Sequence, residues 1–163
     1  MKDIRDAAMS YIEHRPRTKK EMRDHLEKKG YEENEIQDVI ALMEKAHYMS
    51  DASYSAQFMK YGFDKGWSYF RVRMELEKRG VSEQDIEAGR FDYEDEYDVD
   101  IDEEDEKRAL GLAEKFAAAE DITDRKSMGK LQRRLAGFGY GRSTIYHVTE
   151  TIYNRYGKED PYD

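Results

Sequence analysis

A spacing of leucine, glycine and isoleucine recurs three times along the chain. In each copy the leucine lies four residues before the glycine and the isoleucine six residues after it, as in Leu26, Gly30 and Ile36, then Leu76, Gly80 and Ile86, then Leu135, Gly139 and Ile145. The copies are offset by 50 and 59 residues. Internal periods of this size are typical of stacked helical units. The spacing therefore predicts an all-α protein built from three repeats rather than around one large core.

Each copy predicts two helices that meet at the glycine. A hydroxyl residue lies eight residues before each leucine, at Thr18, Ser68 and Ser127. Such residues are preferred N-caps, because the side-chain oxygen accepts a hydrogen bond from a free amide of the first turn. Glycine suits the end of the helix, since it adopts the left-handed conformation without a Cβ clash. A repeat is thus expected to consist of helix 1, a turn, capped helix 2, a glycine and helix 3.

The predicted boundaries follow from this frame. They are repeat 1 at 1–50, repeat 2 at 51–90, an acidic linker at 91–105, repeat 3 at 106–157 and a tail at 158–163. Thr18 and Glu21 form a T-x-x-E capping box at the start of helix 2 in repeat 1. In repeat 2, Trp67 stands before the Ser68 cap and predicts a hydrophobic staple with Val72. Helix 3 of repeat 2 is expected to be shorter or frayed, because Gly89 and Arg90 fall where repeat 1 has Val39 and Ile40.

The acidity of the chain is concentrated in one segment. The formal net charge is −9, yet residues 92–106 contain eleven acids and no lysine or arginine. The remainder has 26 acids and 28 basic residues, so it is nearly neutral. A run of like charges repels itself and is usually solvated. The pattern favours a linker over an ordered element between repeats 2 and 3.

The composition excludes several classes of protein. The absence of cysteine excludes disulfides and thiolate zinc sites, and it fits a reducing cytoplasm. No run of about 18 apolar residues predicts a membrane span. The first residues include acids and no apolar core, so no export signal is expected. A cytoplasmic protein without a cofactor is the prediction.

No motif predicts catalysis or metal binding. The four histidines, His14, His25, His47 and His147, lack the i, i+4 pairing of a helical metal site. Asp98, Asp100 and Asp102 resemble the start of a calcium loop, but Glu103 replaces the required glycine and Ala109 the final glutamate. The GFGYG stretch at 137–141 lacks the GK[ST] of a phosphate loop and predicts a turn. Because no nucleophile has a recognisable base, the chain is predicted not to be an enzyme.

The basic residues gather on the predicted helix 2 of each repeat. The candidates for partner binding are Lys19 and Arg23 in repeat 1, Arg71, Arg73, Lys78 and Arg79 in repeat 2, and Lys130, Arg133 and Arg134 in repeat 3. Arg71 and Lys130 fall at the third helical position, where positive charge opposes the helix dipole. Such placement indicates an anionic partner, either an acidic protein surface or a phosphate backbone. Simple solvation of a charged face is the alternative.

An ordered series of residues resembles the RecX family of recombinase regulators. The series is Asp51-x-x-Tyr54-x-Ala56, then Lys65-Gly66, then Arg71-x-Arg73-x-Glu75-Leu76-x-Lys78-Arg79-Gly80-Val81, after the basic stretch that runs from Arg17 to Tyr31. The resemblance covers about residues 7–88, and the repeat frame extends it over 107–156. It implies three tandem three-helix repeats in an elongated, curved array. Of the motif positions, Arg71 and Arg73 are the interaction candidates, and the apolar residues and glycines are structural.

The resemblance also implies a partner. Proteins of this family bind the RecA filament on DNA and restrain strand exchange, ATP hydrolysis and stimulated repressor cleavage, which affects DNA repair and the SOS response. A monomer with a weaker direct contact to DNA is expected. Two alternatives remain from the residues alone. One is a DNA-binding protein that uses helix-turn-helix-like repeats, and the other is a helical-repeat adaptor for another partner.

Overall fold

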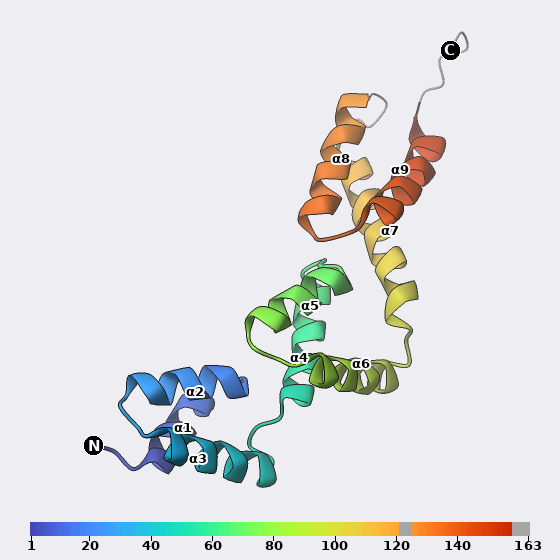
Figure 1. Cartoon of the computed structure of the whole chain (residues 1–163). Coiled ribbons are helices and arrows are strands. Elements are labelled where there is room, and N and C mark those ends of the chain that lie inside the picture. The colour runs from blue at the N-terminus through green and yellow to red at the C-terminus, as the bar shows by residue number, and fades with distance from the viewer. Residues whose placement is uncertain (121–124, 158–163) are drawn as a thin grey trace. The chain divides into compact units, whose positions relative to one another are not determined.

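The computed structural model describes residues 1–120 and 125–157, and these residues form nine α-helices and no strand (Figure 1). The helices are α1 (Ile4–His14), α2 (Lys19–Lys28), α3 (Glu33–Lys45), α4 (Asp51–Asp64), α5 (Tyr69–Lys78), α6 (Glu83–Tyr97), α7 (Ile101–Ala119), α8 (Arg125–Gly137) and α9 (Arg142–Tyr156). Each repeat therefore contains three consecutive helices, and the predicted all-α class is confirmed. The predicted tail at 158–163 lies outside the described residues.

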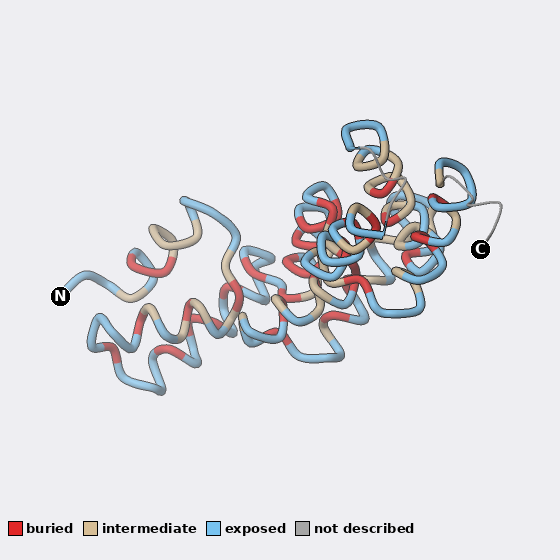
Figure 2. Tube along the Cα trace, turned by 90° about the horizontal axis from the view of Figure 1, so that it is seen from above, coloured by how far each residue is buried: buried red, intermediate tan, exposed pale blue. Residues whose placement is uncertain are grey.

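The chain divides into two compact units. The first contains residues 1–60 and 73–98, and the second contains residues 61–72 and 99–163. Repeat 1 lies wholly in the first unit and repeat 3 in the second, while α4 and α5 contribute to both. Each of these repeats has its own apolar cluster, around Leu26 and Ile36 in one and around Leu131 and Ile152 in the other. Figure 2 shows the buried positions recurring along the helices, as expected when one face of each helix packs inward.

Repeat 1 forms as its sequence predicts. The Thr18 hydroxyl accepts a hydrogen bond from the Glu21 amide, and the Glu21 side chain accepts one from the Thr18 amide, so the capping box is complete. The apolar stripe of α3 is buried at Ile36, Val39, Ile40 and Met43. Local sequence signals therefore suffice to set these helices and the faces they bury.

Helix α6 is longer than predicted. It runs for 15 residues, so the expectation of a short helix 3 in repeat 2 is wrong. Gly89 is buried, and a Cβ there would lie 2.5 Å from the Ser55 Cβ and 2.7 Å from the Ala52 carbonyl oxygen. The glycine is thus the point where α6 meets the backbone of α4. It does not mark the end of the helix.

The acidic segment is mostly helical, so the expectation of an unordered linker is wrong. Helix α6 continues to Tyr97, Asp98 adopts a left-handed conformation with φ 50°, and α7 begins at Ile101. Asp100 caps α7 by accepting hydrogen bonds from the amides of Asp102 and Glu103. Acids in the first turn suit the positive end of the helix dipole, and Ile101 is fully buried. These contacts outweigh the repulsion that the charge pattern suggested.

Helix 2 of repeat 3 begins earlier than predicted. Helix α8 begins at Arg125, so Ser127 lies within the first turn and is not the N-cap. Lys130 is consequently the sixth helical residue, and the argument that it opposes the dipole from the third position is wrong. Serine is tolerated inside a first turn, and its presence alone does not fix a helix boundary.

Candidate partner-binding site

The nine predicted cations all lie on, or directly after, helix 2 of a repeat. Lys19 and Arg23 lie on α2, Arg71, Arg73 and Lys78 on α5, Arg79 just beyond α5, and Lys130, Arg133 and Arg134 on α8. None is fully buried. They differ in their neighbours within the chain. Some have acidic or aromatic partners, and others have no described carboxylate at ion-pair distance.

The N-terminus of α2 is covered by residues of repeat 2. The Thr18 hydroxyl donates to the Arg79 carbonyl oxygen at 2.8 Å, and the Lys19 amide donates to a carboxylate oxygen of Asp51 at 3.0 Å. Gly80, with φ +82°, lies against the Lys20 side chain. The first turn of α2 is therefore part of a joint between repeats.

The N-terminus of α5 is covered in the same way within the second unit. The Tyr69 amide donates to the Asp105 carboxylate at 3.1 Å, and the Ser68 amide donates to the Phe138 carbonyl oxygen at 3.0 Å. The buried Tyr140 hydroxyl donates to the Gly66 carbonyl oxygen at 2.9 Å. Asp51 and Asp105 thus play equivalent parts, since each places a carboxylate on the first amide of helix 2 in the preceding repeat.

Both carboxylates lie in poorly solvated positions. Burial raises the pKa of Asp51 and of Asp105, and the hydrogen bonds from Lys19 and Tyr69 offset part of that effect. Asp51 was recognisable in the sequence only as a motif position, and Asp105 was missed because it lay inside the supposed linker. No local signal pairs Asp105 with Tyr69, because the two are 36 residues apart.

The raised pKa of Asp51 predicts a particular pH dependence. The folded state holds the proton more tightly than the unfolded chain, so the free energy of unfolding falls as pH rises above the ordinary aspartate pKa of about 3.9. An Asp51→Asn substitution keeps an acceptor for the Lys19 amide but removes the titrating group. We expect the variant to gain stability relative to the parent between pH 4 and pH 7 in urea unfolding. A relative loss over that range would show that the ionised carboxylate stabilises α2.

The Arg71 side chain contacts other residues of its own chain. Its guanidinium lies 4.3 Å from the centre of the Trp67 ring and donates to the Gly137 carbonyl oxygen at 2.6 Å. Trp67 and Val72 both lie against Gly62, where the two side chains leave no room for a Cβ. Arg71 is indeed the third residue of α5, as predicted, and its contact with Gly137 gives a structural reason for a cation at that place.

Arg23 and Arg73 make equivalent ion pairs in repeats 1 and 2. Arg23 pairs with Glu33, and Arg73 pairs with Glu83 at 3.0 Å, each bond joining helix 2 to the first turn of helix 3. Arg73 also lies 3.3 Å from Glu77. Exposed pairs of this kind contribute only about 0 to 1 kcal/mol, so a partner's carboxylate can exchange with them at little cost.

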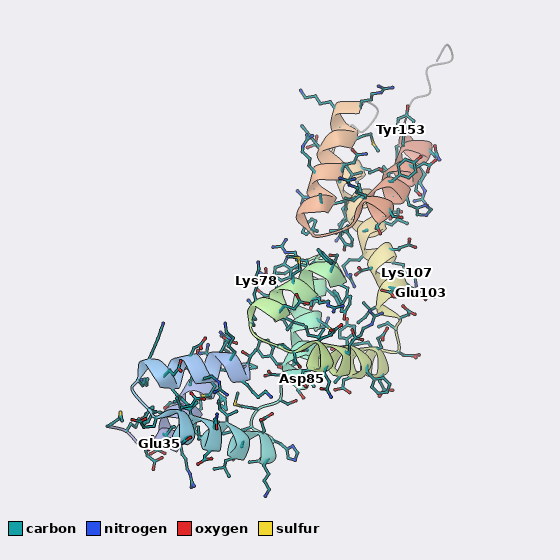
Figure 3. The ribbon with its side chains drawn as sticks, viewed as in Figure 1. Glu35, Lys78, Asp85, Glu103, Lys107 and Tyr153 are labelled. Carbon is teal, nitrogen blue, oxygen red and sulfur yellow. The ribbon has the colours of Figure 1, made fainter. Side chains whose placement is uncertain are left out.

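The other cations of repeats 1 and 2 also have acidic neighbours. Lys19 lies 3.5 Å from Glu44, and Lys78 and Arg79 share Glu75 at 3.4 Å and 2.9 Å. The hydrogen bond from Arg79 lowers the pKa of Glu75. Lys78 remains 66% exposed and is labelled on α5 in Figure 3, so of this group it is the most accessible.

The three candidates on α8 differ from the rest. Lys130, Arg133 and Arg134 are exposed. Within residues 1–120 and 125–157 none of them has a carboxylate at ion-pair distance. Arg134 lies 5.8 Å from the centre of the Phe138 ring. The structure thus leaves the positive charge of α8 uncompensated by the described residues.

A groove between the end of α1 and the start of α4 contains polar groups but no reactive arrangement among its described residues. It has a volume of about 460 Å³, and its lining includes Arg15, Tyr54 and Ser53. Arg15 is paired with Glu21, and burial raises the pKa of Tyr54, which makes that hydroxyl a poorer nucleophile. Across the described part of the chain, no three His, Asp or Glu residues are grouped to hold a metal ion. The described helices also include none long and apolar enough to cross a bilayer.

Comparison with known proteins agrees with this architecture. The family descriptions "RecX, first three-helix domain" and "RecX, second three-helix domain" match residues 5–41 and 50–89. The chain is 34% identical over 155 residues to regulatory protein RecX of Clostridium botulinum strain Eklund 17B, covering 92% of this chain and 68% of the relative. It is 22% identical over 151 residues to regulatory protein RecX of Legionella pneumophila strain Corby, covering 93% and 95%. The crystal structure of RecX from Lactobacillus salivarius superposes with a TM-score of 0.72 at 20% identity, covering 91% and 94%. The chain therefore belongs to the RecX family of regulatory proteins.

Proposed function

We propose that this chain binds the RecA filament on DNA and restrains its recombinase, ATPase and coprotease activities. It acts as a monomeric regulator of DNA repair and the SOS response in the cytoplasm, and it catalyses no reaction itself. The observation that carries the proposal is the family membership, which rests on two consecutive three-helix domains and on a relative matched over most of this chain.

The surface of α5 supports contact with a protein. Arg73 and Lys78 flank Met74, whose side chain is 42% exposed. An apolar side chain between cations is typical of a protein interface, where a desolvated centre is surrounded by polar contacts. The cations lose little when they leave Glu75 and Glu83, because exposed ion pairs are weak.

The repeats give the proposed mechanism. A filament presents the same surface at regular intervals, and a chain with several helix 2 faces can contact more than one RecA protomer. Each contact can be weak, since the first raises the effective concentration of the next. A protein that bridges protomers resists the subunit movements that ATP turnover and strand exchange require.

The test is the ATPase activity of RecA on single-stranded DNA, titrated with this chain. We expect the parent to inhibit and the double variant Arg73→Gln, Lys78→Gln to require a concentration about tenfold higher, which corresponds to about 1.4 kcal/mol. Both side chains are partly exposed, so circular dichroism should show the parental helix content. Failure of the parent to inhibit at any concentration would refute the proposed function.

The matched control removes the acids instead. A Glu75→Gln, Glu83→Gln variant breaks the Arg73–Glu83 and Lys78–Glu75 pairs, and the Arg79–Glu75 pair as well, but leaves Arg73, Lys78 and Arg79 in place. If the cations serve only the fold, both double variants lose activity together. If they bind the filament, the acid variant inhibits at least as well as the parent, because fewer carboxylates of the chain compete for its cations.

A further inference from the structure

Repeat 3 has a charge balance that the other repeats lack. From Arg125 to Gly157 the chain has seven lysines and arginines and one acid, Glu150. The corresponding helices of repeat 1, residues 19–45, have six lysines and arginines against eight acids, and those of repeat 2, residues 69–97, have five against nine. Positive charge is therefore concentrated on α8 and α9.

The ion pair common to repeats 1 and 2 is replaced in repeat 3. In the repeat frame Arg23 and Arg73 correspond to Gln132, while Glu33 and Glu83 correspond to Arg142. Arg142 is the first residue of α9, whose first turn contains no acid. A cation there opposes the helix dipole by about 0.3 to 1 kcal/mol. No described carboxylate pairs with this arginine, which indicates a role toward an anion outside the chain.

The cations of α8 follow one side of the helix. Lys126, Lys130 and Arg133 are spaced four and three residues apart, so they lie on one face, with Arg134 beside them. The opposite face is buried at Met128, Leu131 and Leu135. At a rise of about 1.5 Å per residue the three span about 10 Å, a length similar to three phosphate steps along one strand of duplex DNA at about 3.4 Å each. We name these four residues the α8 cationic stripe.

The stripe lacks the features of a protein interface. No large apolar side chain of α8 is exposed, and a stable protein contact normally contains a desolvated apolar centre. A row of cations to which no described residue offers a carboxylate is instead what a phosphate backbone attracts, through release of its bound counterions. On these grounds nucleic acid fits the stripe better than an acidic protein surface.

We infer that the α8 cationic stripe, together with Arg142 at the start of α9, binds the phosphate backbone of nucleic acid. This assignment deepens the proposed function, on which it rests: repeat 3 contacts the DNA of the filament while α5 contacts its protein. Arg142 adds its charge to that of the stripe, because the equivalent position of repeats 1 and 2 pairs with helix 2.

The test is direct binding of the full chain to fluorescent single-stranded and duplex oligonucleotides, without RecA, over a series of salt concentrations. For Lys130→Glu, Arg133→Glu we expect at least about tenfold weaker binding at low salt. Removal of two phosphate contacts should also reduce the slope of log affinity against log salt by about 1.4 for single strands and about 1.8 for duplex. A Lys28→Glu, Lys45→Glu variant, with the same charge change on exposed residues of repeat 1, should stay within about twofold of the parent.

A second variant separates binding from folding. Arg142→Glu restores the acid that repeats 1 and 2 have at this position, so it should raise the stability of α9 while weakening DNA binding. Parental DNA affinity and salt slope in both α8 and Arg142 variants would overturn the inference and assign the stripe to an acidic protein face. Absence of DNA binding by the parent at low salt would overturn it as well. Neither outcome affects inhibition of the RecA ATPase by the parent, which tests the proposed function separately.

Discussion

A Gly139→Ala substitution should lower the free energy of unfolding of the second unit by about 2 to 5 kcal/mol. Gly139 has φ +98°, where an alanine costs about 1 to 2 kcal/mol. Its Cβ would also lie 2.6 Å from both the Arg71 Cβ and the Ser68 hydroxyl oxygen, which accepts from the Arg71 amide. Neither atom can move freely, so the turn after α8 must shift relative to the start of α5. Overpacking of this kind costs about 1 to 3 kcal/mol more. Urea unfolding followed by the fluorescence of Trp67 measures the loss in this unit.

Gly30→Ala is the matched control for this prediction. Gly30 occupies the same place in repeat 1 and has φ +93°, yet no described atom lies within 4 Å of the position its Cβ would take. The substitution should therefore cost only the backbone strain, about 1 to 2 kcal/mol. Urea unfolding followed by circular dichroism measures this cost. Equal losses at Gly30 and Gly139 would mean that the contact with Arg71 and Ser68 adds nothing to the joint.

The two glycines show how far the sequence could predict the fold. The spacing of leucine, glycine and isoleucine correctly predicts left-handed turns at Gly30, Gly80 and Gly139, because that conformation depends on local chemistry. It does not show that Gly139 touches Ser68 and Arg71, since those residues lie about 70 positions earlier in the chain. Helices and their caps follow from local signals, whereas the joints between repeats are made by distant pairs.

In the acidic segment, local sequence signals predicted the wrong structure. Its charge pattern is typical of a solvated linker, and charge alone would favour that state. The segment forms helix because Ile101 is buried and Asp105 binds the Tyr69 amide and Arg108. Two tertiary anchors, invisible in the composition of the segment, decide its structure. Helix α7 follows from them.

The sequence predicted where the candidate cations lie but not which contacts they make within the chain. Sequence patterns placed nine cations on helix 2 of the repeats, and the structure locates them there. Arg71 makes contacts with Gly137 and Trp67 that the sequence did not indicate, and its binding of a partner stays a prediction. The loss of the ion-pair acid at Arg142 can be read from the repeat alignment, but its meaning required the pairs of Arg23 and Arg73 in the structure.

Alanine should have opposite effects at two helical glycines, Gly89 in α6 and Gly111 in α7. At Gly89 a Cβ would meet the Ser55 Cβ at 2.5 Å and the backbone atoms Ala52 O and Ala56 N at 2.7 Å and 3.0 Å. Backbone cannot rotate aside as a side chain can, so α6 must move off α4. Overpacking costs about 1 to 3 kcal/mol, occasionally more, and it exceeds the gain of about 0.5 to 1 kcal/mol that alanine brings to a helix interior. We expect net destabilisation of the first unit.

At Gly111 no described atom lies within 4 Å of the added Cβ, so the helical preference of alanine acts alone. Gly111→Ala should therefore stabilise the second unit by about 0.5 to 1 kcal/mol, because glycine loses more backbone entropy on folding. Paired urea titrations of the two variants, followed by circular dichroism, compare one chemical change in two environments. Stabilisation by Gly89→Ala would mean that α6 and α4 are not in close contact, and the length of α6 would then need another cause. The sign of the change at Gly89 thus tests whether the glycine serves helix packing, because propensity alone predicts a gain at both positions.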